Sequence, residues 1–206
     1  MKQIKFSICT ASLFMLMSCV DLNLNPLSEG SSENWYSSQA EIEMSLNDFY
    51  RTDFFPIDDM KWGDDVTARN ETSAVNNGTL TSEDGTIAKR WENYYKGIAR
   101  ALRIINNMDR ARAMGVSERD IAQYEGEAYF YLGYAYGMLA FHWGDAILDK
   151  VGMSLDEAYT ASRSPKADVL AYSYECLDKA AERLPNSYPG IQRATKGAAY
   201  AFKARI

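Results

Sequence analysis

Aromatic, charged and amide side chains gather in the stretch between residues 52 and 85. Two phenylalanines and a tryptophan offer flat apolar faces, on which the C–H faces of sugar rings can stack. Carboxylate, guanidinium and amide groups, which could bond sugar hydroxyls, follow the tryptophan. The candidate ligand-binding residues are Phe54, Phe55, Trp62, Asp64, Asp65, Arg69 and Asn70. The pattern is equally consistent with a Trp62 that only packs this stretch onto neighbouring elements, and both interpretations stay open.

The sequence does not contain a pattern typical of catalysis or metal binding. His142 is the sole histidine, and without a second histidine or a cysteine cluster it does not indicate a metal site. The paired acids at 58–59 and 64–65 lack the spacing of an EF-hand. Glu125 and Glu127 point to different faces of a helix, so they do not form a ready acid–base pair. No Ser-His-Asp set, phosphate-binding loop or dinucleotide fingerprint is found. We therefore expect no enzymatic activity, no cofactor and no bound metal.

The N-terminus has the pattern of an export signal. Lys2 and Lys5 precede a mostly apolar run, residues 6–17, that is too short to span a bilayer. Leu16 and Ser18 stand three and one residues before Cys19, which resembles the bacterial lipobox. That signal implies cleavage before Cys19, a diacylglycerol on its sulfur and an acyl chain such as palmitate on the new amine. The alternative is an ordinary secretory peptide followed by an unmodified cysteine.

Charge and cysteine content narrow the classes of partner. The 206 residues carry 22 Lys and Arg against 28 Asp and Glu, a net charge of −6, which argues against a nucleic-acid partner. Removing residues 1–18 takes away two lysines and no acids, so the remaining chain is more acidic still. If Cys19 carries lipid, Cys176 is the last thiol and no internal disulfide can form. We expect Cys176 to be a small packing residue.

Helical periodicity dominates the rest of the chain, so the fold class is mostly α. A Ser38–Glu41 capping box predicts one helix start, and Ser117 predicts another. We expect helices after residue 38, over about 86–110, over 117–143, from Ser164-Pro165 to about residue 184, and from Thr195 onward. Residues 52–85 and 145–164 are expected to be irregular loops. Three glycines inside the third helix predict close packing against another backbone: Gly126, Gly133 and Gly137.

Four short strings, taken in their order and spacing, resemble one family. They are Trp91-x-x-x-Tyr95-x-x-Ile98; Glu127-Ala128-x-Phe130, leading to Trp143-Gly144-Asp145; Leu177-x-x-Ala180-x-x-x-Leu184-Pro185; and Arg193-Ala194-Thr195-Lys196-Gly197. With the lipobox, they resemble the N-terminal region of the SusD-like (RagB/SusD) outer-membrane nutrient-binding lipoproteins. The resemblance implies tetratricopeptide-like helix pairs with a long irregular loop, and members well over twice this length. We therefore expect a signal peptide at 1–18, a lipidated tether at 19–36, and an incomplete, truncated helical domain at 37–206.

The resemblance also implies a function. Members bind glycans or other oligomeric nutrients outside the cell and act as a lid on a SusC-like TonB-dependent transporter. We thus expect a lipid-anchored protein on the outer face of the outer membrane that delivers oligosaccharides to such a transporter. Two alternatives stay open: a tetratricopeptide-like envelope scaffold that binds other proteins, suggested by Leu132-Gly133-x-x-Tyr136, and capture of peptides instead of glycans.

Overall fold

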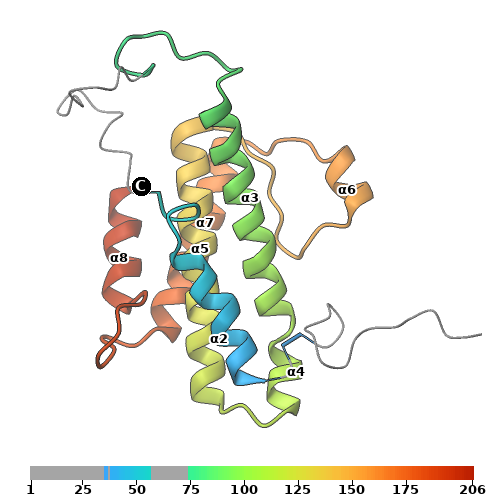
Figure 1. Ribbon diagram of the computed structural model, residues 1–206, viewed down its shortest axis with the longest axis vertical. Coiled ribbons are helices and arrows are strands. Elements are labelled where there is room, and N and C mark those ends of the chain that lie inside the picture. The colour runs from blue at the N-terminus through green and yellow to red at the C-terminus, as the bar shows by residue number, and fades with distance from the viewer. Residues whose placement is uncertain (1–34, 37, 57–73) are drawn as a thin grey trace, which may run out of the picture. The chain divides into compact units, whose positions relative to one another are not determined.

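The computed structural model describes residues 35–36, 38–56 and 74–206 and is mostly helical (Figure 1). The elements are α2 (Gln39–Asn47), the 3₁₀ helix η2 (Asp48–Tyr50), α3 (Gly85–Asn106), α4 (Met108–Ala113), α5 (Glu118–Trp143), α6 (Leu155–Thr160), α7 (Lys166–Arg183) and α8 (Lys196–Arg205). In these residues the only β pairing is an isolated bridge between Ala146 and Ser164. None of the described helices is long and apolar enough to cross a membrane.

Local capping signals explain where several helices begin. Ser38 and Glu41 form the predicted capping box at the start of α2, each side chain accepting a hydrogen bond from the other residue's backbone N–H. The Ser117 hydroxyl accepts from the Asp120 N–H at the start of α5, and Thr195 caps α8 in the same way. These three predicted starts are confirmed.

Helix α5 is the centre of the helical unit that comprises Tyr36–Ile206. It packs against α3 on one side and α7 on the other, and α7 in turn packs against α8 (Figure 1). Gly133 shows why this helix tolerates glycine, because a Cβ there would lie 2.5 Å from Cγ of Leu177 on α7. The Ser173 hydroxyl also donates a 2.6 Å hydrogen bond to the Gly133 carbonyl, so a side chain of α7 contacts the backbone of α5 directly. The predicted close packing of this glycine is confirmed.

The structure differs from the sequence-based expectation in one of the predicted helices. The helix predicted over 86–110 is interrupted at Asn107, whose side chain donates to the Arg103 carbonyl and separates α3 from α4. Helix α7 has a wide buried face, which includes Val169, Tyr172 and Cys176. The width follows from the position of α7 between α5 and α8, which cover it from two sides.

The connection over 145–164, predicted to be irregular, contains the short helix α6. Ser154 and Glu157 form a capping box at its start, the same device that begins α2. No residue of α6 is buried, so its helical form depends on local hydrogen bonds and not on packing.

Candidate functional site

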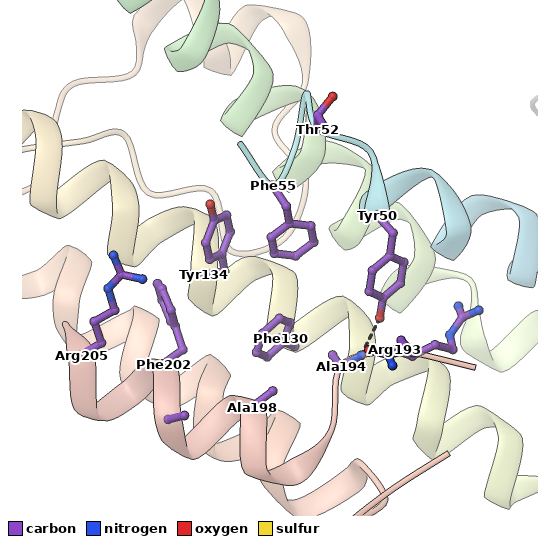
Figure 2. Close-up of a pocket in the computed structure, with 12 residues that line it drawn as sticks. Tyr50, Thr52, Phe55, Phe130, Tyr134, Arg193, Ala194, Ala198, Phe202 and Arg205 are labelled. Carbon is purple, nitrogen blue, oxygen red and sulfur yellow. Dashed lines mark hydrogen bonds between the residues drawn. The ribbon is translucent and has the colours of Figure 1, made fainter. Parts of the chain in front are cut away.

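An open groove of about 660 Å³ lies between α5, α8 and the residues that follow η2 (Figure 2). Four of the lining residues are alanines or a threonine with short side chains, so the walls are formed mainly by aromatic rings. The lining residues are Tyr50, Thr52, Phe55, Phe130, Tyr134, Gln192, Arg193, Ala194, Ala198, Ala201, Phe202 and Arg205. The volume falls within the range of small-molecule sites in proteins.

The aromatic rings of the groove support one another. The Phe55 ring centre lies 4.5 Å from that of Tyr134 and 6.0 Å from that of Tyr50. Across the groove, the Tyr134 and Phe202 ring centres are 5.0 Å apart. Phe55, Phe130 and Phe202 are half-buried, so parts of their rings remain accessible. Apolar ring faces of this kind can stack against the C–H face of a sugar or against another apolar ligand.

A buried ion pair fixes one end of the groove. The Glu127 carboxylate on α5 accepts from Nε of Arg193 at 2.8 and 2.9 Å, and the Glu127 side chain is only 1% exposed. The Tyr50 hydroxyl donates to Glu127 at 2.9 Å and accepts from the Ala194 N–H at 2.8 Å. Arg193 also donates to the Asn47 side chain at 2.6 Å. The cluster therefore ties α2 and η2 to α5 and to the residues preceding α8, which are the elements that form the groove.

Burial and charge oppose each other at Glu127. Burial raises the pKa of the Glu127 carboxyl, and the neighbouring Arg193 guanidinium lowers it in part. Burial and the adjacent Glu127 carboxylate likewise raise the pKa of the Tyr50 hydroxyl, which stays protonated and donates to that carboxylate. These groups are held by one another, so the cluster is suited to positioning and not to proton transfer.

The structure separates the two phenylalanines among the predicted site residues. Phe54 is 4% exposed and lies against Tyr131 with ring centres 6.0 Å apart, while the Arg100 guanidinium lies 4.9 Å from its ring. Phe55 lines the groove. The remaining candidates lie outside the described residues: Cys19, Trp62, Asp64, Asp65, Arg69 and Asn70. The lipid attachment at Cys19 and the ligand-binding role of the other residues stay predictions.

Two further groups bear on chemistry. Cys176 is buried, and burial raises the pKa of its thiol to about 12, so it is a poor nucleophile. In the parts of the chain that the structure describes, no three His, Cys, Asp or Glu side chains are close enough together to hold a metal ion.

Comparison with known proteins decides the family. Residues 29–206 match the SusD-like family described as "Starch-binding associating with outer membrane". The chain belongs to this family. The SusD-like protein P2 of Formosa agariphila is 24% identical over 214 residues, which cover 94% of this chain and 41% of that protein.

Solved structures of SusD-like proteins have the same fold. A SusD-like carbohydrate-binding protein of Bacteroides fragilis aligns with a TM-score of 0.70 and 22% identity over 84% of this chain and 37% of that one. A structure solved with a xylogluco-oligosaccharide aligns with a TM-score of 0.65 and 18% identity over 80% of this chain and 34% of that one. The SusD-like chain thus spans roughly two fifths or less of the length of these relatives, which is consistent with its match to part of a larger SusD-like fold.

Membership of the SusD-like family establishes the general class of the protein. The family is a carbohydrate-binding one associated with the outer membrane, and its members bind without catalysing a reaction. The predicted family and the mostly α fold are therefore confirmed.

Proposed function

We propose that this protein is a lipid-anchored lipoprotein that captures oligosaccharides at the outer face of the outer membrane and delivers them to a SusC-like TonB-dependent transporter. The observation that carries the proposal is the family match over residues 29–206. The lipobox at Cys19 supports the anchor, and the xylogluco-oligosaccharide in a related structure supports the ligand class. The transporter as partner follows from the resemblance to the family.

The groove supports oligosaccharide as the ligand. Aromatic faces at Phe55, Phe130 and Phe202 suit the C–H faces of sugar rings. Arg205, Gln192 and Thr52 at the same groove offer guanidinium, amide and hydroxyl groups that can bond sugar hydroxyls. We propose that Phe55 and Trp62 are stacking residues, with Asp64, Asp65, Arg69 and Asn70 as polar partners.

We expect Trp62→Ala and Phe55→Ala each to weaken oligosaccharide binding, because each removes an aromatic face of the site. Burying such a face contributes about 1–2 kcal/mol, so affinity should fall roughly five- to thirtyfold. Isothermal titration of the full-length protein with xylogluco- and starch-derived oligosaccharides measures the change. A fluorescent oligopeptide series run in parallel distinguishes glycan from peptide capture.

Tyr159→Ala on α6 is the matched control for these variants, because Tyr159 is 81% exposed and does not line the groove. It should bind oligosaccharide as the wild type does. If Trp62→Ala and Phe55→Ala also bind with wild-type affinity, the proposed stacking site is wrong.

The proposed lipid anchor can be tested separately through the membrane association of a Cys19 variant. Cys19→Ala removes the sulfur that would receive the diacylglycerol, and multiple acyl chains are what make such anchoring stable. We expect the variant to move from the membrane fraction to the soluble fraction of fractionated cells. Cys176→Ala is the matched control, because it makes the same substitution at a buried cysteine that would carry no lipid. This control variant should stay with the membrane. Membrane retention of Cys19→Ala would contradict the anchor.

A further inference from the structure

The connection between α5 and α7 carries α6 away from the helix bundle. In Figure 1, α6 stands off beside α3, on the side of the view opposite α8. The Ala146–Ser164 bridge closes the base of this excursion with hydrogen bonds of 3.2 and 2.8 Å. The connection is therefore an excursion with a closed base and a short helix of its own.

Two tyrosines, the fully buried Tyr136 and the half-buried Tyr95, hold the excursion in a defined position. The Tyr95 hydroxyl donates to the Ile147 carbonyl at 3.0 Å and accepts from its N–H at 2.8 Å. The Tyr136 hydroxyl makes the same pair of bonds with Asp149, at 2.8 and 2.9 Å. The Asp149 carboxylate then accepts from the three backbone N–H groups of residues 151–153, at 2.7–3.1 Å. The segment before α6 is therefore fastened to the body by its backbone.

The fastened segment and the helix α6 that follows it present large apolar side chains to solvent. Val151 is 73% exposed, Leu155 70% and Tyr159 81%. Leu155 and Tyr159 are four residues apart and lie on one face of α6. None of the three side chains contributes to the core. Exposed apolar side chains that lie together on a surface often mark a site of interaction with another molecule.

The charge around these side chains indicates what kind of partner fits. Asp156 and Glu157 are exposed on α6. The two cations of the same connection are directed back to the body, where Lys150 lies 4.8 Å from the Tyr172 ring centre and Arg163 lies 4.9 Å from that of Trp91. The exposed tip is consequently apolar and acidic. Such a tip complements an apolar pocket bordered by lysine or arginine and is repelled by an anionic lipid surface.

We propose that Val151, Leu155 and Tyr159, the α6 docking surface, bind an apolar pocket bordered by basic side chains on a partner protein. That partner is the TonB-dependent transporter, an identity that rests on the proposed function. A tyrosine and a leucine on a helix whose preceding segment is already fixed in place lose little conformational freedom on binding, which favours such residues as the centre of an interface.

The test is co-purification of the lipoprotein with a SusC-like TonB-dependent transporter produced in the same cells. We expect Leu155→Ala/Tyr159→Ala to reduce the transporter recovered by at least tenfold. We expect Asp156→Lys, which reverses an exposed charge outside the capping box, to reduce it as well and to make the loss worse at low salt. Tyr200→Ala is the matched control, because Tyr200 is 54% exposed on α8, and it should recover wild-type amounts.

The outcomes separate this proposal from the proposed function. Undiminished recovery by the double variant, or equal loss with Tyr200→Ala, would overturn the α6 docking surface while leaving the transporter partnership intact. A wild-type protein that recovers no transporter would overturn the partnership and the docking surface together. Oligosaccharide titration of the same variants should give wild-type affinity, and its result decides glycan capture independently of docking.

Discussion

We expect Arg193→Met to lower the free energy of unfolding by about 3–5 kcal/mol at neutral pH, the usual cost of leaving one member of a buried ion pair without its partner. Methionine keeps much of the arginine's volume, so the loss reports the charge and its hydrogen bonds. Glu127 would keep the Tyr50 hydroxyl and the Gln123 amide as donors, at 2.9 and 3.4 Å, but would lose both bonds from Arg193. Urea unfolding followed by circular dichroism measures the change.

The deficit of Arg193→Met should depend on pH. Burial raises the pKa of Glu127 in the wild type, and Arg193 opposes that rise, so the variant has a higher Glu127 pKa still. A carboxyl whose pKa is higher in the folded state binds protons more readily when folded, so its contribution to stability falls as the pH rises through that range. We therefore expect a smaller deficit relative to the wild type at about pH 5 than at about pH 8.

Arg112→Met is the matched control for Arg193→Met. Arg112 pairs with Asp109, Glu118 and Glu125, but its side chain is 36% exposed, so water screens these pairs. The same chemical change should cost less than about 1 kcal/mol there. Equal losses for the two variants, or a loss at Arg193 that does not change with pH, would show that the Glu127–Arg193 pair does not hold the groove together.

The helices were predictable because their signals are local. Ser38 and Glu41 are three residues apart, and the bonds they make in the capping box follow from that spacing alone. The Ser154–Glu157 box at α6 has the same spacing, so the sequence contained the signal for this helix as well. The helix was nevertheless not predicted, because its six residues are fewer than the window over which apolar periodicity indicates a helix.

The site was only partly predictable, because its geometry depends on distant partners. Phe54 and Phe55 are adjacent and chemically identical, yet the turn after η2 directs one to the core and the other to the groove. Glu127 and Arg193 are 66 residues apart, and neither periodicity nor capping pairs them. A usable signal did exist, since the two residues begin two of the four strings that resemble the family, and a shared buried contact explains why both strings carry a charge.

The contact between α3 and α5 should be the most sensitive to added volume. A Cβ at Gly97 would overlap the hydroxyl and two ring carbons of Tyr131. Tyr131 is fully buried, and its ring is stacked on Phe49 with centres 4.7 Å apart, so it has no free space to move into. Overpacking of a core costs about 1–3 kcal/mol and occasionally more. We expect Gly97→Ala to destabilise the protein by about that amount, although alanine favours a helix over glycine by about 1 kcal/mol.

Two comparisons show whether the overlap with Tyr131 causes this loss. Gly85→Ala places the same methyl group on the same helix, where no heavy atom lies within 4 Å, so it should be neutral or slightly stabilising. Tyr131→Leu shortens the opposing side chain and destabilises the protein by itself through the cavity it leaves. In that background, however, Gly97→Ala should cost much less than in the wild type, because residues in contact do not contribute additively. Urea unfolding of the four proteins of this cycle measures the coupling, and an equal cost of Gly97→Ala in both backgrounds would contradict the α3–α5 contact described here.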